Sequence, residues 1–132
     1  MITLLNEYYQ IDRMDVGDNE TVFGVTLLPD YCAYRGHFPG NPVSPGVCNI
    51  QMIKECAERL VGKRLFLGYI AKCRMSAVIT PQISPRLQIR MKFSEVSTAA
   101  VETVYQVSAT VSDDTTIYME FKGELTSNRT TK

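Results

Sequence analysis

The stretch SPGVCNIQMIKECAERLVG, residues 44–62, predicts the one long helix of the chain. Ser44 is a favourable N-cap, Pro45 suits the first helical position, and Gly62 is a natural C-terminal stop. We expect Lys54, Glu58 and Arg59 to lie largely off the apolar face. The apolar face recurs at helical spacing and consists of Val47, Ile50, Ile53, Ala57 and Leu60, widened by Met52 and Cys56.

Segments typical of β-strands lie on both sides of this helix. Before it, residues 7–15 and 21–28 flank a Gly-Asp-Asn turn and predict a hairpin. After it, a β-prone segment is followed by three segments in which apolar and polar residues alternate; these four are residues 65–79, 86–93, 101–111 and 117–125. The order of two strands, one helix and four strands predicts an antiparallel sheet that buries the apolar face of the helix, which is an α+β architecture.

Length and composition indicate one globular domain over residues 1–132, with a frayed tail at 126–132. Fourteen basic and fourteen acidic residues cancel, so the charge balance gives no footprint for nucleic acid. No window is apolar enough to span a membrane, and the N-terminus does not resemble a signal peptide. The four cysteines form no CxxC pair and the chain has one histidine, so we expect no metal site and reduced thiols in a cytoplasmic protein.

That single histidine, His37, lies in a loop that leads directly into the helix. Pro39, Pro42 and Pro45 each fix a backbone angle, so the loop is expected to be stiff. The helix start favours negative charge, and Gly46 has no side chain to keep an oxygen away from its N–H groups. An imidazole beside such a helix end suits acid–base chemistry on a carbonyl compound. A loop histidine bonded only to backbone fits the same residues, and both interpretations stay open.

The segment HFPGNPVSPGV, residues 37–47, resembles the signature of the 3-hydroxyacyl-acyl-carrier-protein dehydratases. The predicted order of strands and helix also fits that family, from about Tyr8 to Leu125. The resemblance implies the hotdog fold, in which a sheet wraps around one central helix, and a dimer whose interface forms the acyl tunnel. The matching residues are His37, Phe38, Pro39, Pro42, Pro45, Gly46 and Val47.

The resemblance also implies the chemistry of a lyase in fatty acid or related lipid biosynthesis, acting on an acyl thioester held by an acyl carrier protein. His37 would take the C2 proton of the 3-hydroxyacyl thioester, and the Gly46 N–H would hold the thioester oxygen. Phe38, Pro45 and Val47 would contact the substrate. The reaction implies no metal and no organic cofactor.

The chain departs from the family at the position of its catalytic acid, fourteen residues after the histidine, where it has Gln51. An amide cannot donate a proton as a carboxylic acid does, although it can position a hydroxyl or a water molecule. Glu55 lies four residues later, on the same helix face, and can supply a carboxyl group one turn along. Alternatively, Glu55 pairs with Arg59, also four residues away, on the flank of the helix.

Three functions follow from these residues. The first is a dehydratase that uses His37 with Gln51 and Glu55 as a homodimer or higher homo-oligomer. The second is a catalytically impaired hotdog subunit that binds acyl thioester or pairs with an active homologue, which Gln51 favours. The third is a hotdog acyl thioesterase, in which Gln51 or Glu55 holds the attacking water.

Overall fold

The computed structural model describes residues 3–28, 46–80, 85–98 and 103–127. Within these ranges the chain forms two strands, one helix and four strands, as predicted. The segment that carries His37, Phe38 and Pro45 lies outside the described residues, as does Ser44. The elements are β1 (Tyr9–Val16), β2 (Thr21–Leu27), α1 (Gly46–Val61), β3 (Phe66–Met75), β4 (Arg86–Thr98), β5 (Thr103–Ser112) and β6 (Ile117–Thr126).

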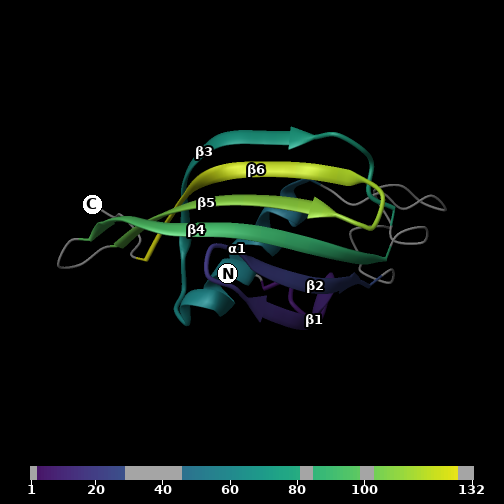
Figure 1. The fold of residues 1–132 in the computed structure, drawn as a ribbon, viewed down its shortest axis with the longest axis horizontal. Coiled ribbons are helices and arrows are strands. Elements are labelled where there is room, and N and C mark those ends of the chain that lie inside the picture. Colours follow the sequence, from purple (N-terminus) through teal and green to yellow (C-terminus); the bar gives the residue numbers. More distant parts are fainter. Residues whose placement is uncertain (1–2, 29–45, 81–84, 99–102, 128–132) are drawn as a thin grey trace.

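The six strands form one sheet in the order β1-β2-β4-β5-β6-β3, and every neighbouring pair is antiparallel. α1 lies against one face of this curved sheet (Figure 1). β1 and β3 are the two edges, so β3, which follows the helix in the chain, is separated from β4 by β6 and β5. One helix held by an antiparallel sheet is the predicted α+β hotdog architecture, which is confirmed.

The core forms where alternating residues of the sheet face the helix. In β5 the buried residues are Tyr105, Val107, Ala109 and Val111, at the period of two that the sequence predicts. Neighbouring strands contribute Leu87, Ile89, Met91, Met119, Phe121 and Leu125 to the same cluster, and α1 contributes Met52, Ile53, Cys56 and Ala57. Burial of these side chains is the main favourable contribution to the stability of the fold.

The end of α1 agrees with the predicted stop, and most of its predicted apolar stripe is buried or packed against the core, with Val47 as the exception. Gly62 has φ 81° and its N–H donates to the Glu58 carbonyl at 2.8 Å, which closes the helix. Val47, placed on the apolar stripe, is 74% exposed, whereas Lys54, placed off it, is buried. Lys54 is buried because the Leu65 carbonyl oxygen, just before β3, and Glu58 both accept from its ammonium group.

None of the helical structure in the described part of the chain has the length and apolar character needed to cross a membrane.

Candidate functional site

The start of α1 is the first part of the candidate site. Gly46 is the first residue of the helix, where the N–H groups of the first turn have no partner within the helix. A Cβ at Gly46 would lie 2.7 Å from the Cε of Met75, so the tip of Met75, at the end of β3, lies beside the helix start. Val47, the next residue, is exposed. The site thus combines donor N–H groups with two apolar side chains, Val47 and Met75.

A buried hydrogen bond also fixes the first turn of α1. Asn49 is buried, and its Oδ1 accepts a hydrogen bond from the Tyr8 hydroxyl at 2.6 Å. This bond joins the helix to the segment before β1, 41 residues away in the chain. Such an anchor limits the movement of the turn that carries Gly46.

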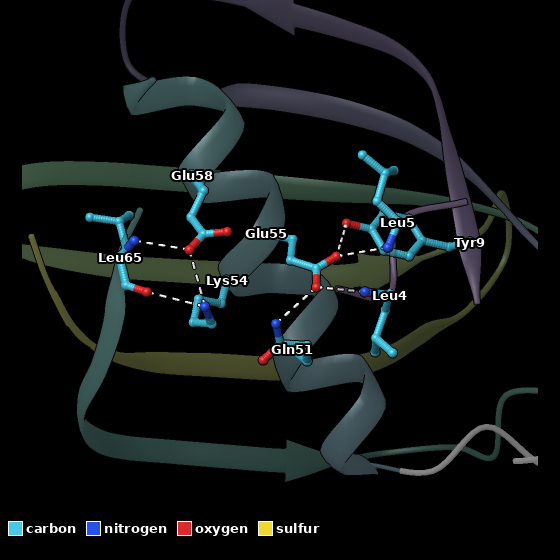
Figure 2. Close-up of polar contacts among 8 residues, drawn as sticks. All are labelled: Leu4, Leu5, Tyr9, Gln51, Lys54, Glu55, Glu58 and Leu65. Atoms are coloured by element: carbon cyan, nitrogen blue, oxygen red, sulfur yellow. Dashed lines mark hydrogen bonds and ion pairs between the residues drawn. The ribbon is translucent and has the colours of Figure 1, made fainter. Parts of the chain in front are cut away.

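Gln51 and Glu55, the two residues considered for the acid, are in direct contact (Figure 2). Glu55 Oε2 accepts from the Gln51 Nε2 at 2.8 Å and from the Leu4 N–H at 2.8 Å. Glu55 Oε1 accepts from the Leu5 N–H at 3.0 Å and from the Tyr9 hydroxyl at 2.9 Å. An ionised carboxylate has about four acceptor positions, so these four donors fill them. Glu55 is 6% exposed, and its carboxylate is turned towards the N-terminal segment.

The alternative in which Glu55 pairs with Arg59 does not describe this arrangement. Among the described residues no hydrogen bond or ion pair joins these two side chains, because the Glu55 oxygens are bonded to Leu4, Leu5, Tyr9 and Gln51. A catalytic role for Glu55 stays a prediction.

Tyr9 and Cys56 form the buried border of this cluster. Burial, with the neighbouring Cys56 thiol and the Glu55 charge, raises the pKa of the Tyr9 hydroxyl well above its ordinary value. Burial and the Glu55 charge likewise raise the pKa of the Cys56 thiol, although the Tyr9 hydroxyl and Arg59 act in the opposite direction. Tyr9 therefore remains a hydrogen-bond donor to Glu55, and Cys56 remains a thiol at neutral pH.

A second polar cluster, of Lys54, Glu58 and Leu65, joins α1 to the segment that follows it (Figure 2). Lys54 Nζ lies 3.1 Å from Glu58 Oε2 and 3.1 Å from the Leu65 carbonyl oxygen. The same Glu58 oxygen accepts from the Leu65 N–H at 2.9 Å. These contacts join α1 to the residue that precedes β3 and explain the burial of Lys54.

A surface pocket of about 270 Å³ borders Gln51 and Glu55. Arg59 in the last turn of α1, with Lys63 and Arg64 just after it, lines the basic side of this pocket, which Glu58 also borders. Cations near a helix C-terminus are favoured by the helix dipole, so the charge here has a structural reason. Within the described residues there is no group of three or more His, Cys, Asp and Glu side chains arranged to hold a metal ion.

The structure thus places four of the predicted site residues, Gly46, Val47, Gln51 and Glu55, on one helix, and brings the last two into contact. The roles of Leu4, Leu5, Tyr8 and Tyr9 were not foreseen. These residues meet the helix across 41 to 51 positions of chain. Only the spacing of four between positions 51 and 55 was visible in the sequence.

The antiparallel sheet held against one central helix defines a hotdog protein. The chain belongs to the ApeI-like family, because the family model described as ApeI dehydratase matches residues 13–115.

Curated relatives agree with this assignment. The chain is 32% identical over 105 residues to the 3-hydroxyacyl-[acyl-carrier-protein] dehydratase FabZ of Pediococcus pentosaceus, covering 74% of this chain and 69% of that protein. It is 30% identical over 90 residues to the FabZ of Lactiplantibacillus plantarum, covering 62% of this chain and 60% of that protein. The match therefore spans only part of these relatives, 60% of the length of one and 69% of the other.

Solved structures show the same fold. The dehydratase heterocomplex ApeI:P from Xenorhabdus doucetiae matches with a TM-score of 0.57 at 18% identity, covering 87% of this chain and 95% of that one. An uncharacterized protein from Erwinia carotovora subsp. atroseptica matches with a TM-score of 0.52 at 17% identity, covering 87% and 89%. At these identities the likeness concerns the fold.

Proposed function

We propose that this protein is a hydro-lyase that removes water from a 3-hydroxyacyl thioester carried on an acyl carrier protein, giving the trans-2-enoyl thioester. Membership of the ApeI-like dehydratase family is the observation that carries the proposal. The segment 37–47 and the helix that begins at Gly46 supply the two groups that the chemistry needs. The named curated relatives are dehydratases, which favours this function over a thioesterase.

In the proposed reaction His37 takes the proton from C2 of the substrate, and the electron pair of the broken C2–H bond forms the C2–C3 double bond. The C3–O bond breaks, and the leaving hydroxyl takes up a proton and departs as water. Negative charge that develops on the thioester oxygen is stabilised by the Gly46 N–H at the start of α1. Phe38, Pro45 and Val47 hold the substrate beside these groups, and the exposure of Val47 is compatible with such a contact.

The proton for the leaving hydroxyl has two candidate routes in this proposal. Glu55 donates it directly, as a replacement for the missing acid, or Gln51 orients the hydroxyl while another group supplies the proton. The contact between Gln51 and Glu55 makes the two residues one unit in either case.

We further propose that the protein works in the cytoplasm as a homodimer, with β3 as the contact. β3 is an edge strand, and its exposed residues include Leu67, Tyr69, Ile70 and Met75. An open strand edge with apolar side chains favours pairing with a second chain. Pairing there would bring a partner beside Met75 and the start of α1.

A second candidate is a subunit that depends on an active homologue. Two observations favour it: Gln51 replaces the usual acid, and the similar structure from Xenorhabdus doucetiae is a dehydratase heterocomplex. In that arrangement the homologue would supply the carboxyl group, and β3 would pair with the homologue.

The test is hydration of a trans-2-enoyl thioester on acyl carrier protein by the purified protein, with His37→Ala alongside. We expect turnover by the wild type and a loss of at least about 100-fold in His37→Ala, because general-base catalysis contributes about 10²–10⁴-fold. Binding of the thioester without turnover would favour the second candidate. Neither binding nor turnover would exclude both.

A further inference from the structure

The orientation of the Gln51 amide is set by its contact with Glu55. A carboxylate only accepts hydrogen bonds, so the Gln51 side chain must turn its NH₂ group towards Glu55 Oε2, at 2.8 Å. Its carbonyl oxygen then points away from Glu55 (Figure 2). Among the described residues no hydrogen-bond donor reaches that oxygen, and Gln51 is only half-buried, beside the pocket of about 270 Å³.

Glu55 itself has no acceptor position left for a substrate. Two of its four donors are backbone N–H groups, which have no acceptor capacity and are fixed by the segment before β1. To reach a substrate the carboxylate would have to leave the buried Leu4 N–H and the partly buried Leu5 N–H without their acceptor, which is unfavourable because water does not replace a lost partner inside the protein. The group that can reach a ligand from this cluster is therefore Gln51.

We infer that Glu55 is a positioning residue, which holds the Gln51 amide with its carbonyl oxygen outward, so that position 51 accepts a hydrogen bond from the 3-hydroxyl of the substrate. The inference rests on the proposed function and selects one of its two proton routes. Gln51 aligns the hydroxyl but donates no proton to it. The base that takes the proton from C2 must then give it to the departing hydroxyl. In total the C2–H and C3–O bonds break, the C2=C3 bond forms and one water is released.

The kinetic test compares Gln51→Ala, Glu55→Gln and the double variant in the hydration assay. We expect each single change to lower kcat/KM by about 10-fold, the value of one hydrogen bond of about 1.4 kcal/mol. The double variant should be no slower than Gln51→Ala, because Glu55 acts only through Gln51. The pH profile of kcat should keep its shape in Glu55→Gln, since positioning changes the rate but not the titrating groups.

Three results would overturn the inference. A loss above about 100-fold in Glu55→Gln, together with disappearance of one limb of the pH profile, would make Glu55 the acid. Multiplied losses in the double variant would mean that the two residues act separately. Unchanged activity in Gln51→Ala would show that the Gln51 carbonyl oxygen does not act on the substrate.

A measurement without turnover separates this inference from the proposed function. The side-chain NH₂ resonances of Gln51 in ¹H–¹⁵N spectra report its bond to Glu55 directly, and we expect Glu55→Gln to shift them. Unshifted resonances would overturn the positioning bond even in an active enzyme. If Glu55→Gln shifts the resonances but the wild type has no activity, the bond between the two side chains exists and the proposed function is overturned. The role of Gln51 towards a substrate then falls with it.

Glu58→Gln is the matched control. It removes a carboxylate from the same helix, three residues along, on the flank that holds Leu65. We expect it to lower the unfolding temperature while the Gln51 NH₂ resonances and the shape of the pH profile stay as in the wild type. An equal shift of those resonances in Glu58→Gln would attribute the effect to general loosening of α1 and would overturn the inference.

Discussion

Glu55 and Glu58 lie three residues apart on α1, and their carboxylates turn towards different neighbouring segments (Figure 2). Both accept hydrogen bonds from backbone N–H groups of segments that flank the helix. Glu55 holds Leu4 and Leu5 before β1, and Glu58, with Lys54, holds Leu65 before β3. The helix is therefore fixed to the sheet by polar contacts on both flanks as well as by its apolar face.

The two carboxylates differ in how many of their acceptor positions are occupied by hydrogen bonds. Glu55 is 6% exposed and both of its oxygens accept two hydrogen bonds. Glu58 is more exposed, and one of its oxygens serves both Lys54 and Leu65. A carboxylate with all its acceptor positions occupied serves structure first, because any other use must break bonds that are already made. The difference indicates that the flank with Gln51 is the more rigid of the two.

Glu55→Ala should give the largest loss of stability and so test the comparison most strongly. The change leaves two N–H groups, the Tyr9 hydroxyl and the Gln51 amide without their acceptor, and we expect the free energy of unfolding to fall by about 3 kcal/mol or more. Glu58→Ala should cost about 2 kcal/mol, because it removes fewer bonds in a wetter place. Urea unfolding of both variants measures the difference, and equal losses would contradict the ranking.

These two clusters also show what the sequence can and cannot predict. Periodicity and punctuation predicted the order of the elements and the closure of α1 at Gly62, because both are local properties of the chain. The spacing of four predicted that Gln51 and Glu55 share a face of the helix. The partners of Glu55 lie about fifty residues earlier, and nothing in the neighbourhood of position 55 indicates which backbone N–H groups will meet it.

Val47 and Lys54 show the limit of local patterns on the helix itself. Hydropathy alone placed the valine inside and the lysine outside, and the structure reverses both. Lys54 is buried because the Leu65 carbonyl and Glu58 satisfy its ammonium group, which is a consequence of how the chain turns back after the helix. The role of His37 rests on the family resemblance, since it lies outside the described residues.

The pH dependence of stability should sharpen the comparison, because Tyr9 and Cys56 adjoin Glu55. Burial raises the pKa of the Cys56 thiol above its ordinary value of 9.0 and that of Tyr9 above 10.0. A group whose pKa is higher in the folded state than in the unfolded state loses its proton first in the unfolded state. Its contribution to stability is therefore complete below the unfolded-state pKa and declines as pH rises above that value. We therefore expect unfolding free energy to fall above pH 9, with a slope for Cys56 that approaches about 1.4 kcal/mol per pH unit.

Urea unfolding between pH 8 and pH 10 measures this decline, with Cys56→Ala as the comparison. The variant should begin less stable, because it loses buried volume, but its stability should fall less steeply with pH. Parallel declines in the two proteins would mean that the thiol does not contribute.

Glu20→Gln should give the smallest effect and extends the comparison to a carboxylate without backbone partners. Glu20, just before β2, pairs with Arg90 on β4 at 2.8 Å, and the side chains are 33% and 50% exposed. Water already solvates both charges, and an exposed ion pair contributes at most about 1 kcal/mol, often much less. We expect a change in unfolding free energy below about 0.5 kcal/mol, and a smaller one still at high salt because the pair is screened. A loss as large as that of Glu58→Ala would contradict the comparison. It would show that ion pairing alone, without bonds to backbone N–H groups, accounts for the stability that the carboxylates on α1 contribute.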